Sequence, residues 1–241
     1  HMVSTKPDYY PFDWRSWPEA QQEQLWGRSM LVNKAERIDI ECVARGYLAG
    51  SAWNEYKSTG SVAGIKLDED MLESGQLYEP LFTPATKAAS GHDENITFEY
   101  LVSLLGVELA GRLRDSTLAL YTWAAEFARQ RGIIIADTKL EFGMLDGELI
   151  VIDEMFTPDS SRFWEVEKYK FGEGQASLDK QYVRDWLLQS GWDREPPAPA
   201  LPDDVAARTS EKYLEAYSRL TRSDLLSRLA LERNAHAKMA R

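Results

Sequence analysis

A segment in the middle of the chain, residues 132–164, restricts the fold more than any other part of the sequence. It reads GIIIADTKLEFGMLDGELIVIDEMFTPDSSRFW. An apolar β-branched run, residues 133–135, opens it, and a second strand-like run covers residues 149–152. Between them lies Leu145-Asp146-Gly147, and an Asp-Gly pair between two strand-like runs is typical of a tight turn. The segment therefore predicts a β-hairpin, and with it an antiparallel pair of strands.

The first strand of this hairpin carries an alternating charge pattern. Asp137, Lys139 and Glu141 alternate with a threonine, a leucine and a phenylalanine. Because side chains of a strand point to opposite faces with a period of two, all three charged side chains are predicted to share one face.

Whether Asp153 joins them depends on the turn. A three-residue turn with Gly147 in the left-handed conformation pairs Glu141 with Val151 and Lys139 with Asp153. Glu141 and Asp153 then share a face as diagonal neighbours, and this is the register we predict. A two-residue Asp-Gly turn would shift the pairing by one residue and send Asp153 to the opposite face.

Two carboxylates and a lysine on one sheet face suit Mg2+ and polyphosphate, because Mg2+ takes a few carboxylate oxygens and completes its shell with phosphate and water. The alternative is a solvated face with cross-strand ion pairs, and the hairpin alone favours that alternative. Residues 156–162, FTPDSSR, shift the preference from the solvated face to the Mg2+ and polyphosphate site. They add an acid, two hydroxyls and an arginine beside the acidic pair.

Composition limits the partners of the chain. The net charge of −11 over 241 residues argues against a nucleic-acid partner, although a local group of Arg and Lys can still hold a phosphate. The single cysteine, Cys42, excludes an internal disulfide and suits a reducing cytoplasm. No apolar run is long enough for a membrane span, and no signal peptide is evident. The opening His-Met resembles the scar of an expression tag.

A second group of polar residues follows the predicted strand 37–44. Arg45, Gly46, Gly50 and Ser51 lie between this strand and a predicted helix over residues 52–58. Helix N-termini attract anions, because their first N–H groups have no intrahelical acceptor. Taken alone, Ser51 fits the commoner use of serine as an N-cap.

The remaining elements are predicted from capping residues and periodicity. We expect a helix from a Ser16 capping box to about residue 26, a strand over 30–32 and little regular structure over 60–95. His92 in that stretch has no partner at metal-ligand spacing. Further helices are expected over the ranges 97–105, 107–131, 177–190, 204–220 and 224–241. In the helix over 177–190, Lys180 and Arg184 are four residues apart and share a face, which by default is an exposed basic stripe.

Several of these blocks resemble the SAICAR synthetase family, the phosphoribosylaminoimidazole-succinocarboxamide synthases of purine biosynthesis. The matching blocks are IIIADTKLEFG, IDEMFTPDSSRFW, IECVARGYLAGSAWNEY, LFTPATKAASGHDENI and SLDKQYVRDWL. They occur in the family's order and spacing. The resemblance implies an α+β fold, a mainly antiparallel sheet flanked by helices. It covers a catalytic region (30–222), which follows an N-terminal segment (1–29). The tail (223–241) carries leucines among charges, so we expect it to be helical and to offer a docking or homo-oligomer surface.

The resemblance implies an ATP-dependent ligase that joins the carboxylate of carboxyaminoimidazole ribonucleotide (CAIR) to L-aspartate, giving SAICAR, ADP and phosphate. ATP and Mg2+ would then be required, and the partners would be small molecules. By the resemblance, Glu141 and Asp153 would bind Mg2+, and Lys139 would contact the transferring phosphate or the substrate carboxylate. Lys180 and Arg184 would help to bind aspartate or phosphate.

The ribonucleotide would be held by a second group of residues. By the resemblance, Arg45, Ser51 and Arg162 would bind its phosphate, so these three side chains are expected to converge. Asp137 and Asp159 would orient the imidazole, and together with the lysine of the hairpin they would form the catalytic group.

Two departures from the family pattern stand out. Asp39 occupies a position where the family usually has proline. Family members also carry an N-terminal lobe with a glycine-containing strand-turn-strand over the ATP phosphates, and no such pattern precedes Met30. We therefore expect this chain to bind the ribonucleotide more nearly normally than ATP. Two alternatives remain open: a related carboxylate–amine ligase of specialised metabolism, and a nucleotide-binding remnant without turnover.

Overall fold

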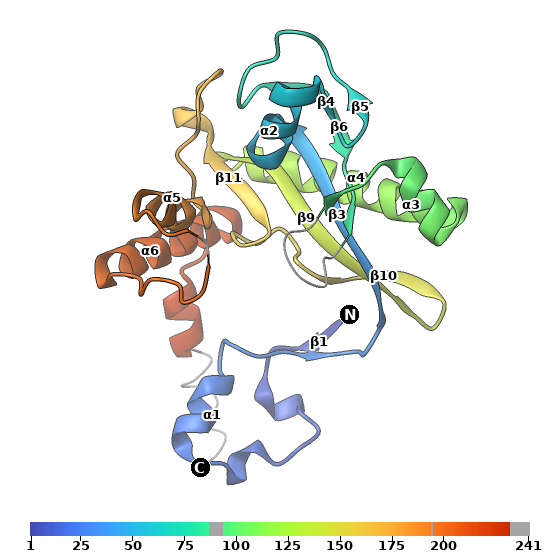
Figure 1. Ribbon diagram of the computed structural model, residues 1–241. Coiled ribbons are helices and arrows are strands. Elements are labelled where there is room, and N and C mark those ends of the chain that lie inside the picture. The colour runs from blue at the N-terminus through green and yellow to red at the C-terminus, as the bar shows by residue number, and fades with distance from the viewer. Residues whose placement is uncertain (87–93, 194, 232–241) are drawn as a thin grey trace.

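The protein is an α+β structure built on a mainly antiparallel sheet, as a computed structural model of the chain shows (Figure 1). It describes residues 1–86, 94–193 and 195–231. The main sheet contains β10 (Glu148–Asp153), β9 (Ile133–Leu145), β3 (Glu36–Tyr47), β7 (Ala85–Thr86) and β8 (Glu94–Asn95) in this order, with β11 (Ser161–Glu165) on β9 and β6 (Gln76–Phe82) on β3. The predicted fold class is confirmed.

The other elements surround this sheet. α4 (Val107–Arg129) crosses one face behind β3 and β9, with α3 (Phe98–Leu105) leading into it, and α5 (Gln181–Gln189) and α6 (Asp203–Thr221) lie beside β11 (Figure 1). The smaller elements are β1 (Met2–Ser4), α1 (Glu19–Leu25), β2 (Leu31–Val32), α2 (Gly50–Thr59), β4 (Ser61–Val62), β5 (Ile65–Lys66) and three short 3-10 turns, Pro7–Tyr9, Trp14–Ser16 and Val166–Lys168. Among the described residues, none of the helices is long and apolar enough to cross a bilayer.

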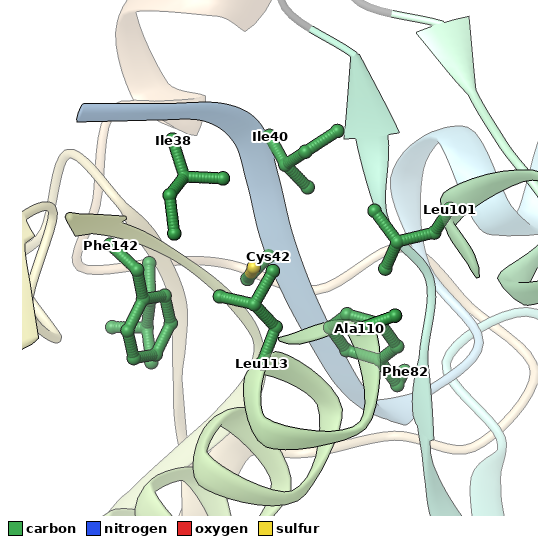
Figure 2. Packing of buried hydrophobic residues seen from close by; sticks show 9 residues of the cluster. Ile38, Ile40, Cys42, Phe82, Leu101, Ala110, Leu113 and Phe142 are labelled. Carbon is green, nitrogen blue, oxygen red and sulfur yellow. The ribbon is translucent and has the colours of Figure 1, made fainter. Parts of the chain in front are cut away.

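Strand β3 separates the core from the functional face. Its even-numbered residues Ile38, Ile40 and Cys42 are buried in one apolar cluster with Leu113 of α4 and Leu140 of β9. Figure 2 shows the three β3 side chains facing Leu113 between strand and helix. The alternation of a strand then directs the odd-numbered residues of β3 to the opposite face. The helix side of the sheet is therefore apolar, and the other side is available for polar chemistry.

Strand β9 changes face along its length. Ile133 and Ile135 pack on the α4 side, whereas Asp137 and Lys139, also odd-numbered, line a cavity on the other side. The pairing of β9 with β11 shifts by one residue between the partners of Asp137 and Ile135, so Ala136 is an extra residue in β9. A bulge of this kind changes the face to which the following residues point. The alternation predicted from residue 137 onward is confirmed.

The turn of the hairpin differs from the prediction. Glu148 pairs with Leu145, so the turn contains only Asp146 and Gly147, and both have positive φ angles, 51° and 84°. These angles are typical of the two-residue type I′ turn, whose twist matches that of the strands. The predicted three-residue turn is therefore wrong, and so is the predicted pairing of Lys139 with Asp153.

A second irregularity restores the predicted face. The register of β10 shifts between Val151 and Asp153, and Asp153 pairs directly with Glu141. One extra residue, Ile152, thus compensates for the shorter turn. Directly opposed residues in an antiparallel pair share a face, so Glu141 and Asp153 do lie on the same face, as cross-strand rather than diagonal neighbours.

Other boundaries also change. The region 60–95 contains β4 to β8: β6 and β7 pair with the distant β3, whereas β4 pairs with β5 and β8 with β7. Residues 87–93, including His92, lie outside the described residues. The helix predicted from residue 177 begins at Gln181, and neither Ser16 nor Ser51 is an N-cap: Pro18 precedes α1, and Ala49 precedes α2. Residues 225–231 are helical, in agreement with the predicted tail helix as far as it is described.

Candidate active site

A cavity of about 730 Å3 lies on the functional face of the sheet. Its walls come from β3, β9, the first turn of α2, the segment leading into β11, and α5 with the residues that follow it. Its charged and polar lining residues include Glu41, Arg45, Ser51, Asp137, Lys139, Asp159, Arg162, Asp179, Lys180 and Arg184. Eight of the ten predicted site residues are among them; the exceptions, Glu141 and Asp153, lie in the adjoining part of the hairpin.

Two arginines meet on one carboxylate inside this cavity. Arg45 Nη1 donates to Asp137 Oδ2 over 3.1 Å, and Arg162 Nη1 donates to the same oxygen. Arg45 is held further by Thr83 Oγ1, 2.9 Å from its Nε, and its Nη2 lies 3.2 Å from Ser51 Oγ. The predicted convergence of Arg45, Ser51 and Arg162 is confirmed.

The charges of this group favour an anion. Burial lowers the pKa of Arg45, the negative charge of Asp137 raises it, and the neighbouring Arg162 lowers it. An arginine side chain remains protonated in proteins despite such effects. Two guanidinium groups against one carboxylate give these three residues a net positive charge, and Arg45 and Asp137 are buried. A phosphate group, which pairs well with planar guanidinium groups, fits this setting.

Gly50 makes room for the second arginine. Its φ of +58° is in the left-handed region, and a Cβ at this position would lie 2.5 Å from Arg162 Nη2 and 2.8 Å from Nη1. Only glycine satisfies both the backbone conformation and the close approach. The first turn of α2 therefore presents Gly50 and Ser51 to the same place as the two arginines.

Lys139 forms the centre of a second charged group. Its Nζ donates to Glu41 Oε1 over 2.9 Å and lies 3.2 Å from Glu154 Oε1. Burial alone would lower the pKa of Lys139, but the hydrogen bonds and charges of Glu41 and Glu154 together raise it. Lys139 is therefore a firmly protonated cation whose ammonium group has a fixed position beside the cavity.

Three carboxylates lie next to each other across three strands. Glu41 of β3 pairs with Glu141 of β9, and Glu141 pairs with Asp153 of β10. Asp153 Oδ1 also accepts the backbone N–H of Glu154 over 2.8 Å. No group of three or more His, Cys, Asp or Glu side chains within the described residues is close enough to hold a metal ion by protein ligands alone. One or two carboxylates fit Mg2+, which takes its remaining ligands from phosphate and water.

The opposite wall of the cavity is supplied by α5. Lys180 and Arg184 both line the cavity, so the shared face predicted from their spacing is turned to the site. Lys180 Nζ lies 3.3 Å from Asp159 Oδ1. Asp159 therefore pairs with a lysine, a role that the sequence did not indicate.

Sequence reasoning missed Glu41, Glu154 and Asp179. Glu41 could have been found, because it precedes Arg45 by four residues in a predicted strand and so shares its face. Glu154 follows β10 in the left-handed conformation (φ 62°), and nothing in the sequence indicates that its side chain turns to Lys139. Asp179 accepts from the nearby N–H of Gln181 and from the N–H of Phe163, 16 residues away, and only the tertiary structure reveals the second contact.

The mainly antiparallel α+β fold, together with a cavity of ligand-binding size and an arginine pair, one buried and one partly buried, defines a protein that binds an anionic small molecule. A family model described as SAICAR synthetase matches residues 10–199, and the chain belongs to this family.

The sequence is similar to those of named relatives over nearly its whole length. The phosphoribosylaminoimidazole-succinocarboxamide synthase of Maridesulfovibrio salexigens is 50% identical over 226 residues, which cover 93% of this chain and 74% of that relative. The corresponding protein of Thermodesulfovibrio yellowstonii is 52% identical over 221 residues, with coverage of 92% and 74%. The solved SAICAR-synthase from Saccharomyces cerevisiae, complexed with SAICAR, is 41% identical with a TM-score of 0.81 and coverage of 93% and 75%. These similarities indicate an ATP-dependent ligase of purine biosynthesis.

Proposed function

We propose that this chain joins the carboxylate of CAIR to the amine of L-aspartate at the cavity described above, with ATP as the phosphoryl donor and SAICAR, ADP and phosphate as products. The observation that carries the proposal is the meeting of Arg45, Ser51 and Arg162, which come from three separate segments. A ribonucleotide phosphate matches their charge and geometry, and their place in a family that makes SAICAR supplies the substrate.

The phosphate subsite is formed by Arg45, Arg162 and Ser51. We assign to Asp137 a role that differs from the one the family resemblance implied. Its Oδ2 accepts from both guanidinium groups, so Asp137 orients the two arginines toward the phosphate rather than the imidazole toward the nucleophile. Side chains held in place before the ligand arrives lose less conformational entropy on binding, which favours affinity.

Lys139 serves the chemical step in this proposal. A carboxylate is a poor electrophile, so the γ-phosphoryl group of ATP is first transferred to an oxygen of the CAIR carboxylate, and ADP leaves. The amine of aspartate then attacks the carbonyl carbon, phosphate leaves with the C–O bonding electrons, and the amine loses a proton. The fixed positive charge of Lys139, held by Glu41 and Glu154, stabilises the negative charge on the transferring group.

Mg2+ belongs to the same proposal. Glu141 and Asp153, directly opposite each other on β9 and β10, are the residues that would hold it. When bound, Mg2+ neutralises phosphate charge and so assists phosphoryl transfer. The third neighbouring carboxylate, Glu41, is engaged by Lys139 and therefore contributes to the position of the lysine.

Aspartate binds, in this proposal, at the α5 side of the cavity. Lys180 and Arg184 face the cavity from α5, and aspartate carries two carboxylates that need cationic partners. The pairing of Lys180 with Asp159 fixes one of these cations beside β11.

We place the reaction in the cytoplasm, since the only cysteine, Cys42, cannot form an internal disulfide.

The test follows ADP and SAICAR together in a mixture of the chain, ATP, Mg2+, CAIR and aspartate. We expect equal amounts of the two products, both dependent on aspartate. Arg162→Gln should raise the KM for CAIR, whereas Arg114→Gln should not, because Arg114 is a partly exposed arginine of α4 that pairs with Asp115 and does not line the cavity. ADP without SAICAR, ribonucleotide binding without turnover, or a product from a different carboxylate and amine would each overturn the proposal.

A further inference from the structure

Asp179 joins two segments that carry different parts of the site. Its side chain is buried, with 3% exposure, between β11 and the start of α5. Oδ2 accepts the backbone N–H of Phe163 in β11 over 2.8 Å, and Oδ1 accepts the backbone N–H of Gln181 in α5 over 2.7 Å. One carboxylate thus fixes the strand and the helix relative to each other.

The residues at both ends of this contact are next in sequence to cationic residues of the cavity. Arg162 immediately precedes Phe163, and Lys180 immediately follows Asp179. Arg184 lies one helical turn further along α5, and its backbone N–H bonds to the carbonyl of Lys180 over 3.1 Å. Asp179, together with the backbone hydrogen bond that Leu178 donates to the Phe163 carbonyl over 2.9 Å, therefore sets the separation between the arginine of β11 and the cations of α5.

The position requires a carboxylate rather than another polar group. Two N–H donors approach it from two different segments, and only a side chain with two acceptor oxygens satisfies both. Burial raises the pKa of Asp179, while the two backbone hydrogen bonds and the charge of Arg162 lower it and Asp137 raises it. An asparagine of the same shape would satisfy one N–H and place its own NH2 group against the other.

We propose that Asp179 is a positioning residue, which holds Arg162 and the cations of α5 at the separation that the two substrates of the ligase require. This inference rests on the proposed function, which assigns the ribonucleotide phosphate to Arg162 and aspartate to Arg184. Both carboxylate oxygens of Asp179 are engaged by backbone N–H groups, so we assign it an effect through the two segments it joins.

The test compares Asp179→Asn with Asp185→Asn, a matched control on α5 whose exposed carboxylate accepts from the side chain of Gln181. Asp179→Asn should raise the KM for both CAIR and aspartate, each about tenfold, the size expected for loss of one charge-assisted hydrogen bond. Asp185→Asn should leave both values unchanged. A merely structural role would reduce the amount of folded protein, which lowers kcat and moves neither KM; that result would overturn the proposal.

A second measurement needs neither turnover nor a folded variant. Ribose 5-phosphate, titrated into the wild-type chain, occupies the phosphate subsite beside Arg162. Because one carboxylate holds both N–H groups, bound ribose 5-phosphate should slow hydrogen exchange at the amides of Phe163 and Gln181 together. Protection of Phe163 alone would overturn the positioning role of Asp179. A chain that binds ribose 5-phosphate but makes no SAICAR would refute the proposed function while this exchange test still decides the role of Asp179.

Discussion

Replacement of Gly50 by alanine tests whether the arginine pair is the phosphate subsite. The new Cβ would lie 2.5 Å from Arg162 Nη2, well inside van der Waals contact, so one of the two groups must move. The guanidinium group is the end of a flexible side chain, whereas the backbone of α2 is held by its own helical hydrogen bonds. Arg162 should therefore move, and its bond to Asp137 should be lost.

The expected cost has two separable parts. Alanine in the left-handed conformation costs about 1–2 kcal/mol of folding free energy. A displaced Arg162 loses a charge-assisted hydrogen bond to phosphate, worth about 1.5–3 kcal/mol. At about 1.4 kcal/mol for each factor of ten, the KM for CAIR should rise on the order of tenfold to a hundredfold.

Gly60→Ala separates the two parts. Gly60 is the C-cap of the same helix, with φ +71°, and a Cβ there would meet no atom within 4 Å. It should show the backbone strain without the change in KM. The measurements are denaturant unfolding for the free energy and steady-state kinetics with CAIR varied. If Gly50→Ala and Gly60→Ala give the same KM for CAIR, the assignment of Arg162 to the ribonucleotide phosphate is refuted.

Three further outcomes follow from the charged and buried groups. Asp137→Asn leaves the buried guanidinium of Arg45 and the partly buried one of Arg162 without their common counterion, so the free energy of unfolding measured with denaturant should fall by about 3–5 kcal/mol; an unchanged value would contradict the pairing. The hydrogen bonds and charges of Glu41 and Glu154 raise the pKa of Lys139 in the folded chain. The contribution of Lys139 to folding stability should therefore be complete below its unfolded pKa of about 10.4 and be lost only as the pH rises further. The difference in unfolding free energy between the wild type and Lys139→Met, followed from pH 7 to 11, should decline only at the alkaline end. A decline near pH 8 would contradict the ion pairs of Lys139 with Glu41 and Glu154. Burial raises the pKa of Cys42 to about 12, so iodoacetamide at pH 8 should modify the thiol only in denaturant, and rapid modification of the native chain by mass spectrometry would contradict its burial.

The alternation along the hairpin was predictable because side-chain direction in a strand is a local property. Asp137, Lys139 and Glu141 share a face as their spacing indicated, and the same rule applied to β3 would have found Glu41. The blocks that resemble the family also predicted most of the site residues correctly, since eight of the ten line the cavity.

Register could not be predicted with the same certainty, because each turn or bulge changes every pairing beyond it. The sequence around Gly147 allowed turns of two or three residues. The structure has two, and an unpredicted bulge at Ile152 returns Asp153 to the face of Glu141. The bulge at Ala136 is equally invisible in the sequence, although it directs Asp137 into the cavity.

The sequence by itself determined the fold class, the family and the residue types of the site, since these depend on local periodicity and on blocks of consecutive residues. The tertiary structure alone decided which charges meet. Asp137 bonds to Arg45, which lies 92 residues away, and Lys139 bonds to Glu41, which lies 98 residues away. Contacts over such separations depend on strand order and register, and these follow from the packing of the whole sheet on α4 rather than from any single segment.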